Sequence, residues 1–255
     1  MFQDVKIYFS GMFFSCNISD IAPLESWDIS NGKNLSRFLS GNLITDITPL
    51  KNWNISKFEY IDYLFASCKN LSDISSLENW DVSNIKCLDG LFYECKNLSD
   101  ISPLKNWNVS NVKTFKYLFN EWSLITDIKP LENWNLSNAT DLSFMFWGCQ
   151  FSDLKPLENW NISNVTDLSY MFCFCSLIKD LKPIQNWNVS NCGNFASMFY
   201  GLKLLTDVSP LIKWNVSNGY SFFGMFSGCQ LIKNGNVLKN WKFSRYIDFN
   251  SLFNN

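Results

Sequence analysis

Eight aspartates recur at one position of this sequence, seven residues before a tryptophan in each case: Asp20, Asp46, Asp73, Asp100, Asp127, Asp153, Asp180 and Asp207. Carboxylates repeated at the spacing of neighbouring chain turns could share Ca²⁺, which needs several oxygen ligands. This aspartate is flanked by leucine or isoleucine and precedes a proline turn, without the glycine-rich loops of calcium-binding repeats. We therefore favour carboxylates that accept hydrogen bonds from backbone amides of the turn, and the calcium alternative stays open.

Six of the nine cysteines share another repeated position: Cys16, Cys68, Cys95, Cys149, Cys175 and Cys229. Neighbours in this column could form disulfides or hold a metal, but the same position also carries Asn42, Trp122 and Leu202. A packing position tolerates such replacements and a bonded framework does not, so we expect buried reduced thiols. The odd total of cysteines favours a reducing compartment.

The chain contains no histidine. This absence excludes Ser-His-Asp and Cys-His nucleophile pairs, histidine-bearing zinc sites and imidazole acid–base chemistry. The phosphate-binding patterns G-x-G-x-x-G and the P-loop are also missing from the sequence. We therefore expect a protein that is not an enzyme and that has no cofactor, no metal and no catalytic residues.

The charge and the hydropathy of the sequence exclude nucleic acid as a partner and insertion into a membrane. A net charge of −2 without runs of like charge lacks the basic footprint of a nucleic-acid-binding protein. No apolar run is long enough for membrane insertion, and the N-terminal segment lacks the basic and continuous apolar regions of a signal peptide. We expect a cytoplasmic or other reducing location, with the cell surface or a virion as the alternative.

The element that must position these residues is a repeat of 26 or 27 residues, marked by regularly spaced tryptophans: Trp27, Trp53, Trp80, Trp107, Trp134, Trp160, Trp187, Trp214 and Trp241. Such a period is typical of solenoids, in which each coil buries its apolar side against its neighbours. We predict one solenoid domain, residues 1–255, of about nine coils. Its last coil, residues 234–255, is atypical and suits a polar C-terminal cap, because Asn234, Lys242 and Arg245 replace Asp, Asn and Asn.

Each coil is predicted to contain short strands and one short helix, which gives an α/β solenoid. Apolar residues five, eight, eleven and twelve positions after each tryptophan have the spacing of one helical face, as in residues 165–172. A serine three positions after each tryptophan is a helix cap candidate, and Ser56 with Glu59 matches a capping box. The short alternating segments around Asp and Trp favour brief strands.

One column of variable residues is a candidate protein-contact face. Ten positions after the tryptophan, on the outward side of the predicted helix, lie Tyr63, Tyr117, Phe144 and Tyr170, interrupted by Gly90. Exposed tyrosines are enriched at protein interfaces, while burial between helices is the alternative. We predict that these four aromatic residues contact a partner.

The segment from Asn161 to Phe172, Asn-Ile-Ser-Asn-Val-Thr-Asp-Leu-Ser-Tyr-Met-Phe, resembles the bacterial surface-protein 26-residue repeat family, a relative of the BspA-type leucine-rich repeats. The likeness covers essentially the whole chain. It implies a leucine-rich-repeat-like solenoid with a role in adhesion or protein interaction and without a catalytic site. A shorter stretch, residues 205–211, is similar to the turn segment of internalin repeats.

Two functions follow as hypotheses. The first is a non-enzymatic protein–protein interaction scaffold or adhesion-type repeat protein whose partner is a protein of unknown identity. The alternative is a structural or assembly protein that stacks on itself or on a larger particle such as a virus capsid. The alternative is motivated by the absence of a separate N-terminal cap, because an exposed N-terminal coil offers a sheet edge for homo-oligomers.

Overall fold

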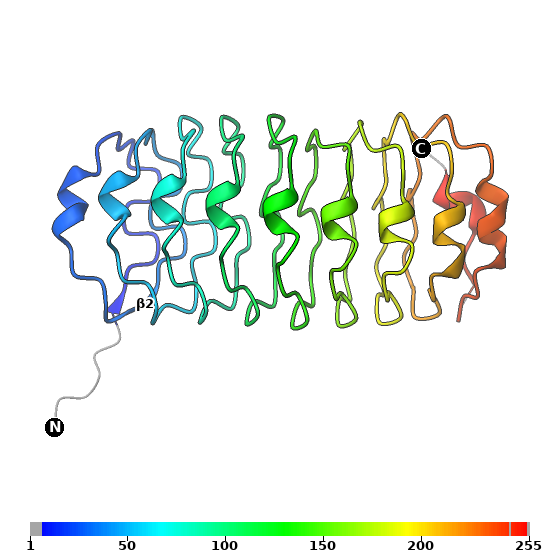
Figure 1. Ribbon diagram of the computed structural model, residues 1–255, viewed down its shortest axis with the longest axis horizontal. Coiled ribbons are helices and arrows are strands. Elements are labelled where there is room, and N and C mark those ends of the chain that lie inside the picture. Colours follow the sequence, from blue (N-terminus) through cyan, green and yellow to red (C-terminus); the bar gives the residue numbers. More distant parts are fainter. Residues whose placement is uncertain (1–6, 245, 254–255) are drawn as a thin grey trace, which may run out of the picture.

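The computed structural model describes residues 7–244 and 246–253. The chain winds into similar coils that stack along the long axis of the molecule, so the sequence runs in order from one end to the other (Figure 1). Strands β1 (Ile7–Tyr8) and β2 (Gly32–Asn34) pair in parallel, and single-residue bridges continue this pairing from Asn34 to Ser221. The repeat is therefore a solenoid, as the period of the tryptophans predicts.

Every helix in the described part of the chain is a short 3₁₀ helix. One precedes each tryptophan, and together these helices form a row along one side of the molecule (Figure 1). They are η1 (Ala22–Ser26), η2 (Thr48–Leu50), η3 (Ser75–Leu77), η4 (Ser102–Leu104), η5 (Lys129–Leu131), η6 (Lys155–Leu157), η7 (Lys182–Ile184), η8 (Ser209–Lys213) and η9 (Gly235–Asn240). Proline at the first or second position fixes φ for this turn in seven of them, η1, η2 and η4–η8. A last helix, η10 (Phe249–Leu252), lies in the C-terminal coil. We call the surface formed by η1–η9 and the aspartates before them the η face.

The short helix predicted after each recurring serine is absent from the described residues of every coil except the last, where η10 lies at the predicted positions. In the coil after Trp160 the N–H of Met171 donates to the carbonyl of Leu168 at 3.3 Å, and Tyr170 between them has a φ of 58°. A positive φ at the third residue marks a tight turn and cannot continue an α-helix. Leu168 and Met171 are nevertheless fully buried, so the predicted apolar positions are right. Successive three- to four-residue turns give them the same period as a helix.

The predicted serine cap is also wrong, because the serine belongs to a turn. The side-chain oxygen of Asn54 accepts the backbone N–H of Ser56 at 3.1 Å, and the Ser56 hydroxyl donates to the same oxygen at 2.7 Å. The same backbone contact recurs in the six following coils, from Ser83 to Ser217. Such Asx turns satisfy backbone donors outside regular secondary structure.

Neighbouring coils are joined by a ladder of backbone hydrogen bonds. After Trp160, four alternate N–H groups donate to carbonyls of the next coil at 2.8–3.0 Å: Leu168 to Asn194, Tyr170 to Ala196, Phe172 to Met198 and Phe174 to Tyr200. The brief strands predicted around each Asp and Trp are absent from the described residues, whose strands are β1 and β2. The inter-coil hydrogen bonds lie instead in the segment predicted as helical, where left-handed residues at alternate steps curl the chain between the bonds. We call the surface formed by positions six to fourteen after each tryptophan, such as residues 166–174, the ladder face.

The core lies between these two faces and is built from columns of equal residues. The tryptophans from Trp53 to Trp241 are only 4–6% exposed, and each indole N–H donates to a carbonyl of the preceding coil, as Trp134 does to Leu104 at 3.1 Å. Beside them five phenylalanines stack with ring centroids 5.7, 5.9, 5.9 and 5.5 Å apart: Phe119, Phe146, Phe172, Phe199 and Phe226. The tryptophan column is thus a core spine, and function must be sought among residues that vary from coil to coil.

Candidate protein-contact face

The ladder face brings the four predicted contact residues into one row. Tyr117, Phe144 and Tyr170 stack nearly in parallel, with ring centroids 4.7 and 4.4 Å apart. Tyr63 belongs to the same column but is separated from Tyr117 by the coil that carries Gly90. All four side chains are partly exposed, so they are neither sealed between coils nor fully open to solvent. Their contact role stays a prediction.

Tyr93 closes the gap above Gly90 and was missed by the sequence analysis. Its ring centroid lies 6.4 Å from that of Tyr63 and 5.9 Å from that of Tyr117, both in edge-to-face geometry. The ring of Tyr63 occupies the space in front of Gly90, where a Cβ would come within 2.2 Å of it. The aromatic row is therefore continuous from Tyr63 to Tyr170. A tyrosine three residues after the interrupting glycine was the available signal.

The backbone of this column favours glycine, yet aromatic residues occupy it. Tyr63, Tyr117, Phe144 and Tyr170 have φ values of 55°, 57°, 59° and 58°. Glycine stands at the same position in three other coils. The left-handed conformation costs an L-residue about 1–2 kcal/mol, and aromatic pairs return about 0.5–1.5 kcal/mol each. Aromatic side chains kept at such a position motivate a surface role.

Tyr63 has a polar setting at the N-terminal end of the row. The guanidinium carbon of Arg37 lies 5.2 Å from its ring centroid, a cation–π contact. Burial, and then the negative charge of Asp89, raise the pKa of Tyr63 to about 12. The phenol is therefore protonated at neutral pH and is available as a hydrogen-bond donor.

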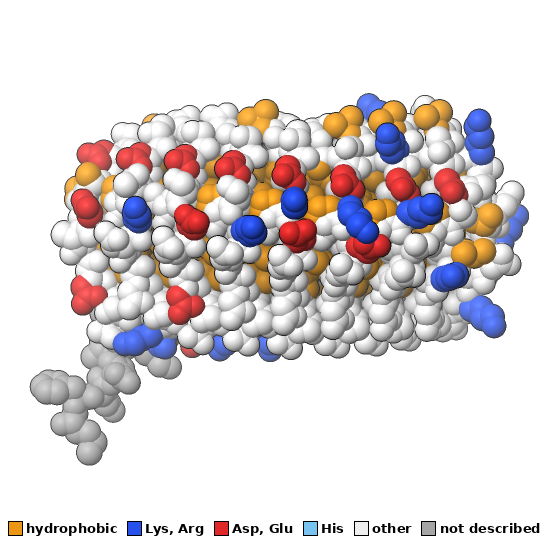
Figure 2. Space-filling model, in the orientation of Figure 1, with side chains coloured by type: hydrophobic (Ala, Val, Ile, Leu, Met, Phe, Trp, Pro, Cys, Tyr) orange, Lys and Arg blue, Asp and Glu red, His pale blue; other side chains and the backbone are white. Residues whose placement is uncertain are grey.

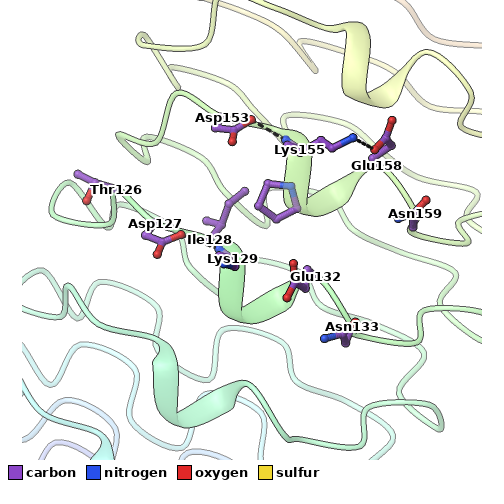
Figure 3. Close-up of a pocket in the computed structure, with 11 residues that line it drawn as sticks. Thr126, Asp127, Ile128, Lys129, Glu132, Asn133, Asp153, Lys155, Glu158 and Asn159 are labelled. Carbon is purple, nitrogen blue, oxygen red and sulfur yellow. Dashed lines mark hydrogen bonds and ion pairs between the residues drawn. The ribbon is translucent and has the colours of Figure 1, made fainter.

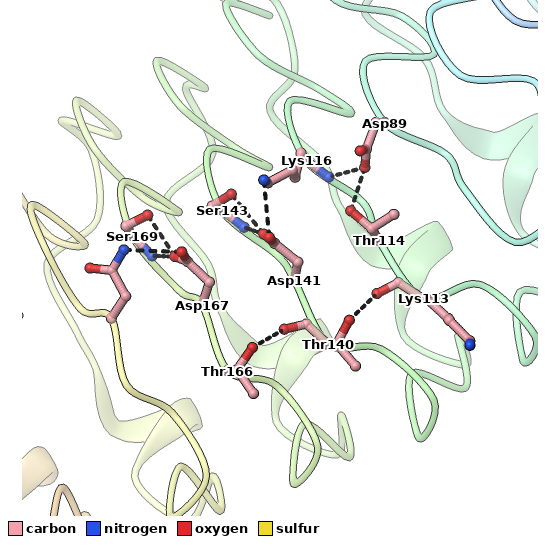
Figure 4. A network of polar contacts seen from close by, with 11 residues as sticks. Asp89, Lys113, Thr114, Lys116, Thr140, Asp141, Ser143, Thr166, Asp167 and Ser169 are labelled. Carbon is pink, nitrogen blue, oxygen red and sulfur yellow. Dashed lines mark hydrogen bonds and ion pairs between the residues drawn. The ribbon is translucent and has the colours of Figure 1, made fainter. Parts of the chain in front are cut away.

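Carboxylates of the ladder face form hydrogen bonds and an ion pair with neighbouring residues of the protein (Figure 4). Asp89 accepts hydrogen bonds from the Thr114 hydroxyl at 2.6 Å and from the Lys116 N–H at 2.8 Å, and its burial raises its pKa. Asp141 accepts from the backbone and hydroxyl of Ser143 and pairs with the Lys116 ammonium at 3.2 Å. These contacts hold neighbouring coils in register.

The charged side chains of the N-terminal and central ladder face also neutralise one another. Lys96 pairs with Glu121 at 2.6 Å, and Lys86 pairs with Glu59. Both pairs join consecutive coils. Exposed pairs of this kind contribute about 0.2–1 kcal/mol each, so they orient coils more than they stabilise them.

On the η face the aspartate column forms the turns predicted for it. In the eight coils that carry this aspartate, one carboxylate oxygen accepts the backbone N–H two residues later at 2.7–2.8 Å, as in Asp46 with Thr48. Hydrogen bonds from Thr48 and Ser209 lower the pKa of Asp46 and Asp207. The carboxylates are exposed, and Figure 2 shows a row of acidic side chains along this face. Within the described residues no group of three or more Cys, Asp or Glu is arranged to hold a metal ion.

A shallow hollow of about 420 Å³ lies between η5 and η6 on the η face (Figure 3). Asp127 and Asp153 line it on one side, and Glu132 and Glu158 on the other. Lys155 pairs with Glu158 across its rim. Because these positions recur along the solenoid, the hollow is a product of the repeat. It pairs no nucleophile with a base.

In most coils the position of the cysteine column carries a hydrogen-bond donor, with Leu202 as an exception. The thiols of Cys68, Cys95, Cys149, Cys175 and Cys229 donate to a carbonyl of the preceding coil at 3.0–3.3 Å. The Trp122 indole and the Asn42 amide, at the same position, donate to the equivalent carbonyls of Phe92 and Phe13 at 2.9 and 2.7 Å. All nine cysteines are free, seven of them buried. Cys, Trp and Asn side chains can all donate a hydrogen bond, and this shared property was the signal in the sequence for a donor at this position.

The fold has known relatives. An internalin C2 of Listeria monocytogenes is similar over 82% of this chain and 77% of its own, with 26% identity and a TM-score of 0.52. An internalin F of the same species is 22% identical over 89% of this chain and 63% of its own, with a TM-score of 0.48. Among curated protein sequences none matches this chain.

The similarity to internalin C2 supports a leucine-rich-repeat solenoid, and the likeness of residues 205–211 to internalin repeats extends to most of the chain. Within the described residues no helix combines the length and apolarity needed to cross a bilayer. A family model, described as Mycoplasma protein of unknown function DUF285, matches residues 6–77, 72–173 and 148–255. The matches cover nearly the whole sequence, and the chain therefore belongs to the DUF285 family.

Proposed function

We propose that this protein is a non-enzymatic interaction protein, a scaffold or adhesion-type repeat, that binds a protein partner through its ladder face. The observation that carries the proposal is the continuous aromatic row from Tyr63 to Tyr170 on this face. The row is built from residues that vary between coils, whereas the residues that recur in the coils form the core and the turns. The likeness to an internalin and to BspA-type repeats supports the same class of function.

Partly exposed aromatic rings are suited to protein contacts. A tyrosine supplies a large rigid apolar area and one hydroxyl at a small cost in side-chain entropy, which is why tyrosines are frequent at interfaces. In this row the aromatic rings already pack against one another, so binding of a partner would cost little additional side-chain entropy. Arg37 at one end adds a charged group of the type that is also enriched at interfaces.

The non-enzymatic part of the proposal rests on the side chains present. The sequence lacks histidine, and the carboxylates of both faces accept hydrogen bonds that build turns or join coils. A protein of this kind needs no cofactor. It can act at a cell surface as well as in a reducing compartment, because seven of its thiols are buried.

Affinity capture from the native cell tests the ladder face directly. The bait is the wild-type chain or a triple variant with Tyr63, Tyr117 and Tyr170 changed to Ser, the residue that Ser197 places in the same column. Quantitative mass spectrometry should find a protein that the wild type enriches and the variant loses by about tenfold or more. A matched control changes Glu132 on the η face to Ser. Equal capture by wild type and triple variant would refute the proposal.

The alternative, an assembly protein that stacks end to end, has less support. In the coil before the last, the N–H groups of Gly224 and Phe226 donate to the following coil at 2.8 and 2.7 Å. In the last coil the corresponding N–H groups, of Ser251 and Phe253, donate within η10 at 3.0 Å. Two of the ladder donors that a second copy would need are thus already used. Light scattering tests this: a mass that grows with concentration would favour assembly.

A further inference from the structure

The charge of the sequence changes near the C-terminal end of the solenoid. Residues 1–207 contain 22 Asp and Glu against 16 Lys and Arg, whereas residues 208–247 contain five Lys and Arg and no Asp or Glu. The aspartate column also ends here, because Asn234 takes its position in the last coil. On the η face, acidic side chains follow one another along the solenoid and basic ones gather at its C-terminal end (Figure 2). The two parts of this face therefore attract ligands of opposite charge.

Four exposed lysines form what we call the basic end: Lys213, Lys233, Lys239 and Lys242. Lys213 is the last residue of η8 and Lys239 lies in η9, and these two helices are neighbours. Lys242 follows Trp241, whose indole N–H donates to the carbonyl of Leu211 in η8 at 3.0 Å. Lys233 precedes Asn234, whose side-chain oxygen accepts the N–H of Val208, the residue before η8, at 3.2 Å. All four lysines thus lie on η8 or on segments that adjoin it.

The lysines of the basic end have no counter-charge within the structure. Among the described residues none of them forms an ion pair, whereas four other lysines do: Lys86, Lys96, Lys116 and Lys155. In three of those pairs the carboxylate belongs to a neighbouring coil. The last coil contains one carboxylate, Asp248, which accepts the backbone N–H of Asn250 at 3.0 Å. The basic end therefore lacks the carboxylates that neighbouring coils provide to lysines further inside the solenoid.

Two exposed apolar side chains stand next to these lysines in the sequence. Ile212 precedes Lys213 in η8 and is 41% exposed, and Leu231 lies two residues before Lys233 and is 48% exposed. At the position of Ile212 the seven preceding coils carry Glu, Lys or Gln. An exposed isoleucine at an otherwise polar position favours a ligand that brings apolar side chains as well as charge, because removal of this surface from water stabilises a complex.

We propose that the basic end binds a short acidic segment of a partner protein, in which aspartates or glutamates stand beside apolar residues. The carboxylates of this segment take the place that carboxylates of a neighbouring coil take in the inner coils. Complementary charge of this kind gives specificity and speeds association. The basic end belongs to the η face and the aromatic row to the ladder face, so the inference goes beyond the proposed function and does not depend on it.

The η face itself favours a short ligand over a long polyanion. Asp180 and Asp207 are exposed on the coils that lead up to the basic end, and further carboxylates precede them along the same face. Hydrogen-bonded coils follow one another at about 5 Å, which is less than the distance of about 8–10 Å over which salt screens exposed charges. A long nucleic acid or a flat anionic membrane would therefore be repelled by these carboxylates, whereas a short acidic segment meets only the lysines.

Peptide binding to the full chain tests the inference with a defined probe. The probe is a labelled nonapeptide of three Asp-Leu-Glu units, and the control peptide carries Asn and Gln in place of Asp and Glu. At about 50 mM salt, fluorescence anisotropy should show saturable binding of the acidic peptide and at least about tenfold weaker binding of the neutral peptide. Failure of the acidic peptide to bind, or equal binding of both peptides, would overturn the proposal.

Variants taken from the repeat itself locate the site. Lys239→Glu introduces the residue that Glu158 places at the same position, and it should weaken binding of the acidic peptide by about tenfold. The matched control is Lys105→Glu, which makes the same change at the same repeat position of a central coil, where the lysine is also exposed. Both variants alter the net charge of the chain equally, but the control should bind like the wild type. Equal losses in the two variants would show attraction by net charge alone and would contradict a site at the basic end.

Three other results would assign the basic end to a different occupant and show the proposal to be wrong. The first is oligothymidylate that binds more tightly than the peptide and is lost in Lys239→Glu, which would indicate nucleic acid. The second is the same behaviour of vesicles that contain phosphatidylserine, which would indicate a membrane surface. The third is a mass that grows with concentration in light scattering for the wild type but not for Lys239→Glu, which would indicate the acidic η face of a second copy.

The triple tyrosine variant separates this inference from the proposed function. With Tyr63, Tyr117 and Tyr170 changed to Ser, binding of the acidic peptide should be unchanged, because these residues lie on the ladder face. If the triple variant loses the peptide and Lys239→Glu retains it, the acidic segment binds the ladder face and the inference is wrong, while the proposed function stands. If capture of the native partner is independent of the tyrosines but the peptide depends on Lys239, the proposed function is wrong and the inference stands.

Discussion

Thiol reactivity should show one fast cysteine and a large protected set. Cys16 is exposed, whereas Cys68 has no exposed surface and Cys229 is 7% exposed. Burial raises the pKa of Cys68 and of Cys229 to about 11 from an ordinary 9.0. Because each pKa unit changes the thiolate fraction tenfold, these two groups are about 100-fold less ionised at pH 7.5 than ordinary thiols. Steric protection lowers their rates further, since the thiolate is the reacting form and must meet the reagent.

Ellman's reagent at pH 7.5 measures this directly. The folded protein, without reductant, should release about one equivalent of chromophore quickly, with Cys87, which is partly exposed, following slowly. Denaturant should bring the total to nine equivalents, because all nine cysteines are free. Cys16→Ser should remove the fast phase alone. Three or more fast thiols in the folded protein would refute the buried column, and fewer than nine in denaturant would reveal disulfides.

Three other perturbations follow from the same structure. Since burial raises the folded-state pKa of Cys68 to about 11, the unfolded chain loses this proton first. The contribution of Cys68 to stability should therefore be constant below about pH 9 and should fall from there through pH 11. Urea unfolding at pH 8, 9.5 and 10.5 checks this, and equal midpoints would contradict it. Trp134→Phe removes the indole N–H that donates to Leu104 and part of a buried ring, so urea unfolding should show a loss of about 1–3 kcal/mol in the free energy of unfolding. A loss below about 0.5 kcal/mol would contradict the role of this hydrogen bond. Asp127→Ala removes a turn acceptor and should lower stability by about 0.5–1.5 kcal/mol in the same assay, whereas Asp127→Asn keeps the acceptor and should be nearly neutral; equal effects of both would point to charge instead.

Several features could be predicted from the sequence because they are periodic or local. The spacing of the tryptophans predicts coils and a buried spine, and Trp53 through Trp241 are indeed buried. The Asp-x-x-Pro pattern predicts a turn whose carboxylate accepts a nearby N–H, and Asp46 does so. Both inferences need only residues within one coil and the knowledge that coils repeat.

The helix could not be distinguished from turns by the same reasoning. Apolar residues at intervals of three and four are produced by an α-helix and equally by consecutive tight turns, because both return the chain to the same side after three or four residues. The sequence offers one warning, since Gly90 and Gly224 stand where Tyr63 and Tyr170 stand in other coils. Glycine alternating with larger residues at one position indicates a left-handed backbone that a helix does not contain.

By itself, then, the sequence determined the repeat, the composition of the core and the column of aromatic residues from Tyr63 to Tyr170. Only the tertiary structure decided that Tyr93 completes this row and that the rings of Phe174 and Tyr220 lie against two different glycines of the coil between them. The physical reason is that these contacts join different columns of different coils. Their distances depend on how each turn directs its side chain across the hydrogen-bonded ladder, and that direction is set by φ values that the pattern of residue types does not encode.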